Sequence, residues 1–285
     1  MMIRKYILFF GLLPALFSCS SPSGNSADEN KEPTKFSIIQ DDSVPSFFFN
    51  KDIPFRMIFP KSYGKADSLP ILFLLHGHGA THYSFTQNIF ELSELADQYD
   101  IILLCVEGEK GWYMDSPKKT NWRYETFIMN ELMPYVFQKY KVCKSAAKRG
   151  IAGYSMGGFG AVYLGLKHPD SFVYVGSTSG GLDILPFPDN WDLSTVLGPQ
   201  EENEELWKQN SPYYMLDKVK GPLKFKLVMD CGESDFFFAV NNAFSEKLDQ
   251  KGIEYEYKVS SGGHDWDYFG RTIPNHLKLF AEVIE

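Results

Sequence analysis

Two uninterrupted apolar runs of strand length, residues 69–75 and 101–106, restrict what this chain can fold into. A run that is apolar at every position marks a strand covered on both faces, whereas a strand with one wet face alternates. Between the two runs, residues 81–99 carry apolar side chains at helical spacing. A buried strand, a helix and a second buried strand together predict a parallel sheet with helices on both faces.

The alternation continues to the end of the chain and predicts one α/β domain over residues 36–285. Strands are expected at 36–40, 54–59, 149–153, 172–175, 225–229 and 254–259, and helices at 120–140, 155–167, 241–250 and 274–284. Residues 180–222 break the rhythm with five prolines. That stretch is too long for an ordinary loop, so we expect a cap-like insertion with short helices of its own.

The N-terminal segment is typical of an export signal. Residues 1–18 combine a short basic start with an apolar run of about a dozen residues, too short for a permanent membrane helix. Residues 16–19 resemble the lipobox of bacterial lipoproteins, which predicts lipidation of Cys19 and a place in the bacterial cell envelope, periplasm or outer membrane. A plain signal peptide with an incidental cysteine is the alternative. The polar residues 19–35 are predicted to be a flexible tether.

Charge and cysteine content argue against a nucleic-acid-binding protein and against a metal site ligated by cysteines. The formal net charge is −8, so the chain has no basic surface of the kind that binds nucleic acid. Cys105, Cys143 and Cys231 follow the tether, and none has a metal-ligand spacing. Cys105 and Cys231 lie in apolar runs, where a free cysteine behaves as a small hydrophobic residue. We therefore interpret them as structural thiols.

The motif that carries chemistry is G-Y-S-M-G at residues 153–157. It lies between a predicted strand and a predicted helix, which is the context required of a nucleophile elbow. A sharp turn there exposes the hydroxyl of Ser155, and the flanking glycines let the backbone pass closely. The N-terminus of the following helix favours a developing negative charge. Ser155 is therefore the candidate nucleophile.

A second motif, H-G-H-G at residues 76–79, ends the first buried strand. An oxyanion hole of this kind combines the backbone N–H of the residue after the nucleophile with one from such a loop. The positions predict the N–H groups of Met156 and His78, with Gly79 as the alternative loop donor. The competing interpretation is a metal site built on His76 and His78, but no carboxylate stands close by in sequence.

The acid and base are expected after the serine, in the chain order Ser, Asp, His. His264 lies in a loop after a late strand and is the candidate base, whereas His276 lies inside the predicted last helix. Asp235 follows a strand end, from which a carboxylate can reach an imidazole, and is the candidate acid. Asp230 is still on the strand and is expected to be structural. Asp230 and Glu233 remain the alternatives for the acid.

Taken together, the motifs at residues 75–79, 112–116, 124–127, 153–158, 230–235 and 263–264 resemble the esterase D-like branch of the α/β-hydrolases. That branch includes S-formylglutathione hydrolases, feruloyl and acetylxylan esterases, tributyrin esterases and mycolyltransferases. The resemblance covers about residues 50–285. It implies the α/β-hydrolase fold and a carboxylesterase that forms an acyl-enzyme on short or aromatic acyl esters without a cofactor.

The sequence predicts the substrate less specifically than it predicts the fold and the reaction. An exported esterase of this branch suits acylated carbohydrates, and Trp112, Tyr154 and Trp266 are the candidate substrate-binding residues. Trp191, Trp207 and residues 236–238 are further aromatic candidates, and packing in the core or cap is the alternative for each. An acyltransferase, a thioesterase of the same fold and a catalytically silent glycan-binding surface protein are the competing functions.

Overall fold

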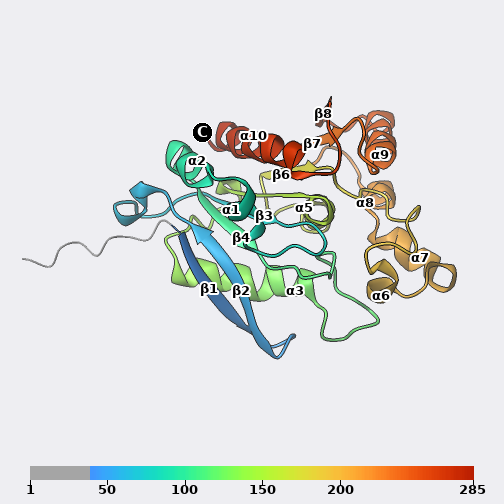
Figure 1. Cartoon of the computed structure of the whole chain (residues 1–285), viewed down its shortest axis with the longest axis horizontal. Helices are drawn as coiled ribbons and strands as arrows, with labels where there is room; N and C mark the ends of the chain where they lie inside the picture. The colour runs from blue at the N-terminus through green and yellow to red at the C-terminus, as the bar shows by residue number, and fades with distance from the viewer. Residues whose placement is uncertain (1–38) are drawn as a thin grey trace, which may run out of the picture. The chain divides into compact units, whose positions relative to one another are not determined.

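The computed structural model describes residues 39–285 (Figure 1). The predicted signal peptide, Cys19 and the tether lie outside the described residues. The strands are β1 (Ile39–Ser46), β2 (Lys51–Ile58), β3 (Ile71–Leu75), β4 (Ile102–Val106), β5 (Arg149–Tyr154), β6 (Tyr174–Thr178), β7 (Lys226–Gly232) and β8 (Glu256–Ser260).

All eight strands form one sheet in the order β1-β2-β4-β3-β5-β6-β7-β8. The β1–β2 and β2–β4 pairs are antiparallel, and every pair from β4 to β8 is parallel. The mostly parallel sheet predicted from the two apolar runs is therefore confirmed. Because parallel strands bring their carboxyl ends to one edge, the loops after β3, β4, β5, β7 and β8 gather there.

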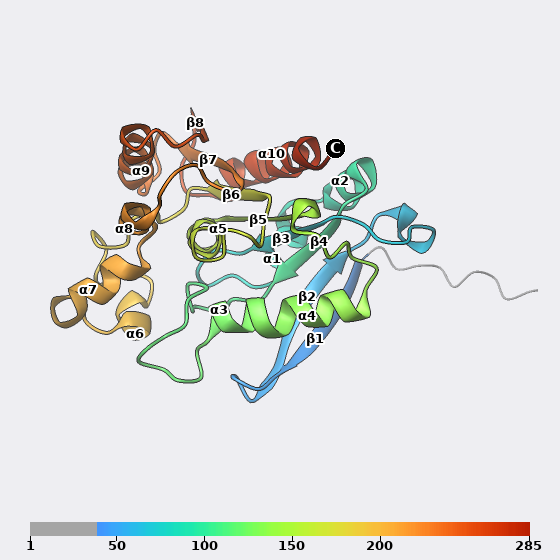
Figure 2. The same ribbon diagram turned by 180° about the vertical axis from the view of Figure 1, so that it is seen from behind.

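Helices cover both faces of the sheet (Figures 1 and 2). They are α1 (Ser84–Asn88), α2 (Leu92–Tyr99), α3 (Tyr124–Phe127), α4 (Met133–Lys139), α5 (Met156–Lys167), α6 (Leu193–Leu197), α7 (Gln200–Asn210), α8 (Pro212–Met215), α9 (Phe238–Gln250) and α10 (Trp266–Ile284). Leu72 and Leu74 of β3 pack in the apolar layer of α1, α2 and α10, and Ile71 and Phe73 pack in the layer of α3, α4 and α5. Every side chain of β3 is thus buried, which explains its uninterrupted apolar run.

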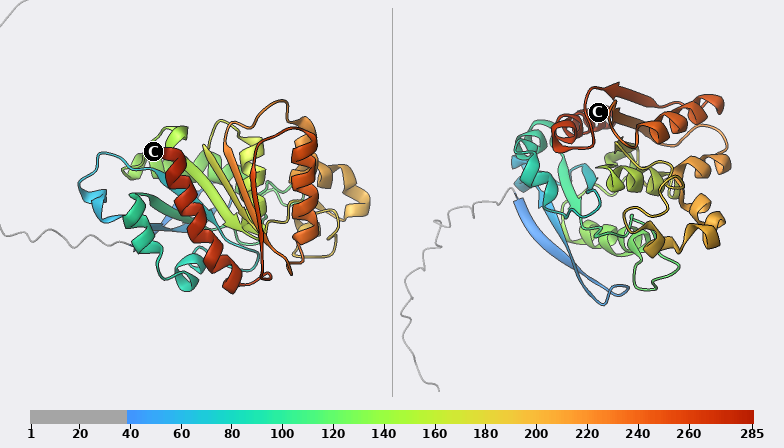
Figure 3. Two further views of the ribbon diagram at one scale, coloured as in Figure 1. Left: turned by 90° about the horizontal axis from the view of Figure 1, so that it is seen from above. Right: turned by 45° about the vertical axis from the view of Figure 1, so that its right-hand side comes forward.

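The helix expected over residues 120–140 begins at Tyr124, and two other helices differ more from their predicted bounds. The helix expected over residues 81–99 is divided into α1 and α2, and Phe90 in the break is 84% exposed. The helix α10, which crosses the strands in Figure 3, begins at Trp266 and not at 274. Asp265 caps it by accepting a hydrogen bond from the Tyr268 N–H at 3.0 Å. The buried stripe then continues past Pro274, so packing outweighs the hydrogen bond that proline removes.

The segment 180–222 between β6 and β7 contains α6, α7 and α8, the short helices expected of an insertion. The first strand extends further than predicted, because β1 continues to Ser46 where the strand was expected to end at residue 40, and residues 36–38 lie outside the described part of the chain. Within residues 39–285, no helix is long and apolar enough to cross a membrane.

Candidate active site

Ser155 lies at the turn between β5 and α5, as the motif predicts. Its backbone has φ 56° and ψ −122°, a conformation that costs a non-glycine residue energy and is typical of functional sites. The Ser155 N–H donates to the Thr178 carbonyl at 2.9 Å, which ties the strained turn to β6. The side chain of Ser155 is thus held at the edge of the sheet, directly before a helix N-terminus.

Ser155, His264 and Asp235 form a continuous hydrogen-bonded series. The Nε2 atom of His264 lies 2.8 Å from Ser155 Oγ, and its Nδ1 atom lies 2.8 Å from Asp235 Oδ2. The second oxygen of Asp235 accepts the Phe237 N–H at 2.7 Å, and the carboxylate is fully buried. In this order the imidazole can take the hydroxyl proton while the carboxylate fixes its tautomer and orientation.

The alternative acids and the second late histidine lie elsewhere. Asp230 stays on β7, 3.0 Å from His276 Nε2, and accepts the Thr178 hydroxyl at 2.9 Å. His276 is 1% exposed on α10, where its Nδ1 lies 2.6 Å from the Tyr174 hydroxyl. Glu233 is exposed. These contacts support a structural role for Asp230 and His276, and they leave Asp235 as the only one of the three acids that pairs with His264.

The loop after β3 lies directly against the serine turn. A Cβ added at Gly77 would meet the Tyr154 ring at 2.6 Å and Ser155 Cβ at 3.3 Å, and one at Gly157 would meet Leu75 O at 1.8 Å. Only glycine permits this approach. Among residues 39–285, neither of the two predicted donors, the backbone N–H groups of Met156 and His78, has a hydrogen-bond partner.

The side chains of His76 and His78 diverge. His76 is fully buried, with Nε2 3.0 Å from Glu107 Oε1, whereas His78 Nε2 lies 3.0 Å from Asp192 Oδ2 in the insertion. No group of three or more histidine, cysteine, aspartate or glutamate side chains within the described part of the chain is arranged to hold a metal ion. The two histidines therefore belong to two different polar clusters.

Glu107, at the end of β4, is a site residue that the sequence analysis missed. Its carboxylate lies 2.6 Å from His82 Nδ1 as well as beside His76, and its side chain is 8% exposed. Burial alone would raise the pKa of Glu107, but hydrogen bonds from the two histidines outweigh burial and hold that pKa well below its usual range. The only sequence signal was an acidic residue directly after a buried strand.

Aromatic side chains form a wall beside His264. The Phe236 ring is 50% exposed and lies 4.1 Å from the imidazole, between centroids. Trp191 from the insertion stacks on Phe236 at 5.2 Å with an angle of 22° between the rings. Phe237 closes the group, at 5.0 Å from Trp191. The wall therefore combines a loop after β7 with the insertion, and one of its faces is open to solvent.

The three aromatic residues predicted to bind substrate have other surroundings. Trp112 is 1% exposed and donates its indole N–H to the Trp191 carbonyl at 2.9 Å, so it supports the wall from behind. Tyr154 is 4% exposed and packs between Trp266 and Phe269, each at 4.8 Å. Neither Trp112 nor Tyr154 is placed to touch a substrate, because both rings are buried. Trp266 is half-buried.

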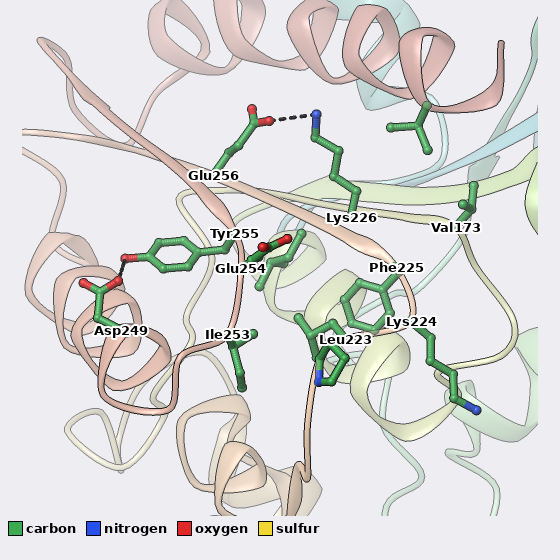
Figure 4. Close-up of a pocket in the computed structure, with 13 residues that line it drawn as sticks. Val173, Leu223, Lys224, Phe225, Lys226, Asp249, Ile253, Glu254, Tyr255 and Glu256 are labelled. Atoms are coloured by element: carbon green, nitrogen blue, oxygen red, sulfur yellow. Dashed lines mark hydrogen bonds and ion pairs between the residues drawn. The ribbon is translucent and has the colours of Figure 1, made fainter.

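One cavity lies away from these residues. It has a volume of about 830 Å³ and is lined by the residues that lead into β7 and β8, among them Phe225 and Tyr255 (Figure 4). Lys226 pairs with Glu256 across it at 2.7 Å. Since Asp235 follows the opposite end of β7, this cavity is separated from the serine by the length of a strand.

Comparison with known proteins agrees with this geometry. Residues 46–280 match the family described as "Putative esterase". The chain belongs to this family. It is an esterase of the α/β-hydrolase fold, an enzyme that hydrolyses ester bonds. The match covers the sheet from the end of β1 and extends into α10.

Individual relatives are distant in sequence. An acetyl esterase of Caldicellulosiruptor saccharolyticus is 26% identical, over 76% of this chain and 85% of its own length. An esterase of Mycobacterium tuberculosis is 25% identical, and the chain spans 52% of that protein. A solved ferulic acid esterase superposes with a TM-score of 0.75 at 25% identity, covering 87% of this chain and 98% of the other. An S-formylglutathione hydrolase from Staphylococcus aureus has the same fold, with a TM-score of 0.75 at 22% identity over 85% and 98% of the two chains.

Proposed function

We propose that the protein is a serine carboxylesterase with Ser155 as nucleophile, His264 as general base and Asp235 as the acid that orients it. The observation that carries the proposal is the unbroken series of two 2.8 Å hydrogen bonds from Ser155 through His264 to Asp235. It occurs beside two backbone N–H groups that have no partner among residues 39–285.

The reaction follows from these contacts. His264 Nε2 takes the proton of Ser155 as Oγ attacks the ester carbonyl, and the N–H groups of Met156 and His78 stabilise the oxyanion. The imidazolium then protonates the leaving alcohol, which leaves an acyl-enzyme on Ser155. Water enters with His264 again as base, and its attack releases the acid and restores the serine.

The proposed substrates are short-chain or aromatic acyl esters of carbohydrates. The exposed face of Phe236, 4.1 Å from the His264 ring, supports an aromatic or sugar ring packed beside the scissile bond. Relatives named for acetyl and ferulic acid esters support the same acyl groups. A thioester substrate, or transfer of the acyl group to an alcohol, would use the same acyl-enzyme.

The test is a substrate panel assayed with the wild type and with Ser155→Ala: p-nitrophenyl acetate, butyrate and octanoate, methyl ferulate and acetylated xylan. We expect Ser155→Ala to lose several orders of magnitude in rate on every ester while it keeps its fold. An equal rate for Ser155→Ala and the wild type would contradict the assignment. A wild type that is folded but silent on the whole panel would favour a transferase or a binding function.

A second pair of variants tests the aromatic wall. Phe236→Ala should lower kcat/KM for methyl ferulate about tenfold more than for methyl acetate, because only the former presents an aromatic ring to the wall. Phe47→Ala is the matched control, since Phe47 is 86% exposed in the turn after β1. Equal losses on the two esters would remove the aromatic preference from the proposal.

We also propose that the chain is exported and anchored at the cell envelope through a lipidated Cys19, which lies outside the described residues. A labelled fatty acid fed to the producing bacterium should appear in the wild type and not in Cys19→Ser. Label in neither protein, with the esterase still exported, would indicate a plain signal peptide.

A further inference from the structure

We infer that Glu107 is the positioning residue of the oxyanion hole: its buried carboxylate fixes the loop of residues 76–82, and thereby the direction of the His78 N–H. The inference rests on the proposed function, because it assigns a role to a residue that touches no substrate. Glu107 follows the last paired residue of β4 directly, and β4 is the parallel neighbour of the strand that leads into the loop.

The contacts of Glu107 reach both ends of that loop. Oε2 accepts the His82 backbone N–H at 3.2 Å and lies 2.6 Å from His82 Nδ1. Oε1 lies 3.0 Å from His76 Nε2 and accepts the Glu109 N–H at 2.9 Å. A buried carboxylate with this many donors is held firmly, because losing any of them would leave charge unpaired. His76 and His82 are therefore fixed to one point of the sheet.

The segment after Glu107 adds a second support. The Tyr113 hydroxyl donates to the His76 carbonyl at 3.0 Å. Glu109, Trp112 and Tyr113 all have positive φ, at 43°, 54° and 56°. Three non-glycine residues in that region so close together are costly, and such strain persists only where the surroundings fix it and is typical of functional sites. The loop after β4 thus has an unfavourable shape that brings Tyr113 beneath the loop after β3.

Between its two fixed ends, the loop of residues 76–82 contains one tight turn. The Ala80 N–H donates to the Gly77 carbonyl at 3.1 Å, and Gly79 has φ +76°, as a type II turn requires. His78 occupies the first central position of that turn, so its N–H points outward and stays free of partners within residues 39–285. A donor aimed in advance stabilises an oxyanion much better than one that must reorient during the reaction.

The test compares Glu107→Gln with Glu125→Gln. Glu125 is a matched control, because it is also a buried carboxylate beside a histidine, with His168 Nε2 at 3.0 Å and a side chain 12% exposed, but it lies on α3. We expect Glu107→Gln to lower kcat on p-nitrophenyl acetate about 10- to 100-fold and to keep KM within threefold of the wild type. This loss is smaller than the 10²–10³-fold loss of kcat that follows removal of a whole oxyanion donor, because the donor remains but is less firmly oriented. Glu125→Gln should keep kcat within twofold.

A trifluoromethyl ketone provides the readout that a merely structural role would not change. Its adduct with Ser155 carries an oxyanion, so its inhibition constant should rise in Glu107→Gln by the same factor by which kcat falls. His82→Phe serves if Glu107→Gln does not fold. It keeps a ring but removes the Nδ1 contact with Glu107, and we expect kcat to fall about three- to tenfold.

A kcat and an inhibition constant that match the wild type in either Glu107→Gln or His82→Phe would overturn the inference. So would an equal loss of kcat in Glu125→Gln, since the effect would then follow general destabilisation. These failures differ from failure of the proposed function, which would appear as an unchanged rate in Ser155→Ala.

Discussion

Replacing Asp235 by asparagine tests the site most severely, because its surroundings leave the new amide a single orientation. The Phe237 N–H donates to Oδ1 at 2.7 Å, so that position accepts only an oxygen. The amide NH₂ must then face His264 Nδ1, where Oδ2 now lies at 2.8 Å. Because Nδ1 must then accept a hydrogen bond, the imidazole carries its proton on Nε2. The Nε2 atom that faces Ser155 is then already protonated and cannot accept the proton of the serine hydroxyl.

The expected cost is about 10⁴-fold in kcat, equivalent to about 5.5 kcal/mol of transition-state stabilisation, as is typical when a triad imidazole is held in the wrong tautomer. Asp230→Asn is the comparison. It disturbs the buried contacts to His276 and Thr178 but not the series through His264, so we expect a loss below tenfold together with lower stability. Thermal unfolding of both variants separates the two effects.

Initial rates on p-nitrophenyl acetate at saturating substrate measure kcat for both variants. The reasoning would be refuted if Asp235→Asn kept a tenth or more of the wild-type kcat, or if Asp230→Asn lost more than Asp235→Asn. The second result would move the acid to Asp230 and require the imidazole to turn away from the contact seen in this structure.

Three further predictions concern folding and exposure. Gly157→Ala should unfold the protein or fail to accumulate, because its Cβ would lie 1.8 Å from Leu75 O, whereas thermal unfolding of Gly64→Ala, with nothing within 4 Å, should match the wild type. Burial raises the pKa of Glu125, but hydrogen bonds from His168 and Lys167 outweigh it and lower that pKa to about 2. The resulting stability is fully present above about pH 4.5 and is lost as the pH falls toward 2, so urea unfolding should show a wild-type advantage over Glu125→Gln that shrinks by about 3 kcal/mol across that range. A disulfide-exchange reagent at pH 8 should label Cys143 in the native domain and reach the other two described thiols only after unfolding, since both are buried and burial raises the pKa of each to about 12; rapid native labelling of all three would contradict the burial.

The sequence was informative where a local pattern fits only one structure. Runs in which every residue is apolar indicated the strands of the parallel sheet, and a glycine-flanked serine between strand and helix indicated the turn at Ser155. Chain order and loop position led to His264 and Asp235, which the structure places in contact.

The sequence was uninformative where contacts between distant segments decide the outcome. Glu107 and His82 are 25 residues apart, and nothing local indicates that they meet. Trp112 is of a residue type that often packs against sugar rings, yet its own ring is buried behind Trp191. Proline is a common first residue of helices, so the sequence predicted a helix that starts at Pro274. The Asp265 cap and the buried stripe instead place the start of α10 at Trp266.

The insertion between β6 and β7 touches the chemistry at few points. Trp191 meets Phe236, and Asp192 meets His78, while Ser155, His264, Asp235 and both predicted oxyanion donors come from other segments. The residues proposed for bond cleavage thus lie outside the insertion, whereas the aromatic wall is shared between the insertion and the loop after β7. A graft that exchanges residues 180–222 with those of another esterase should therefore alter selectivity through the Trp191 half of the wall and leave Ser155, His264 and Asp235 in place.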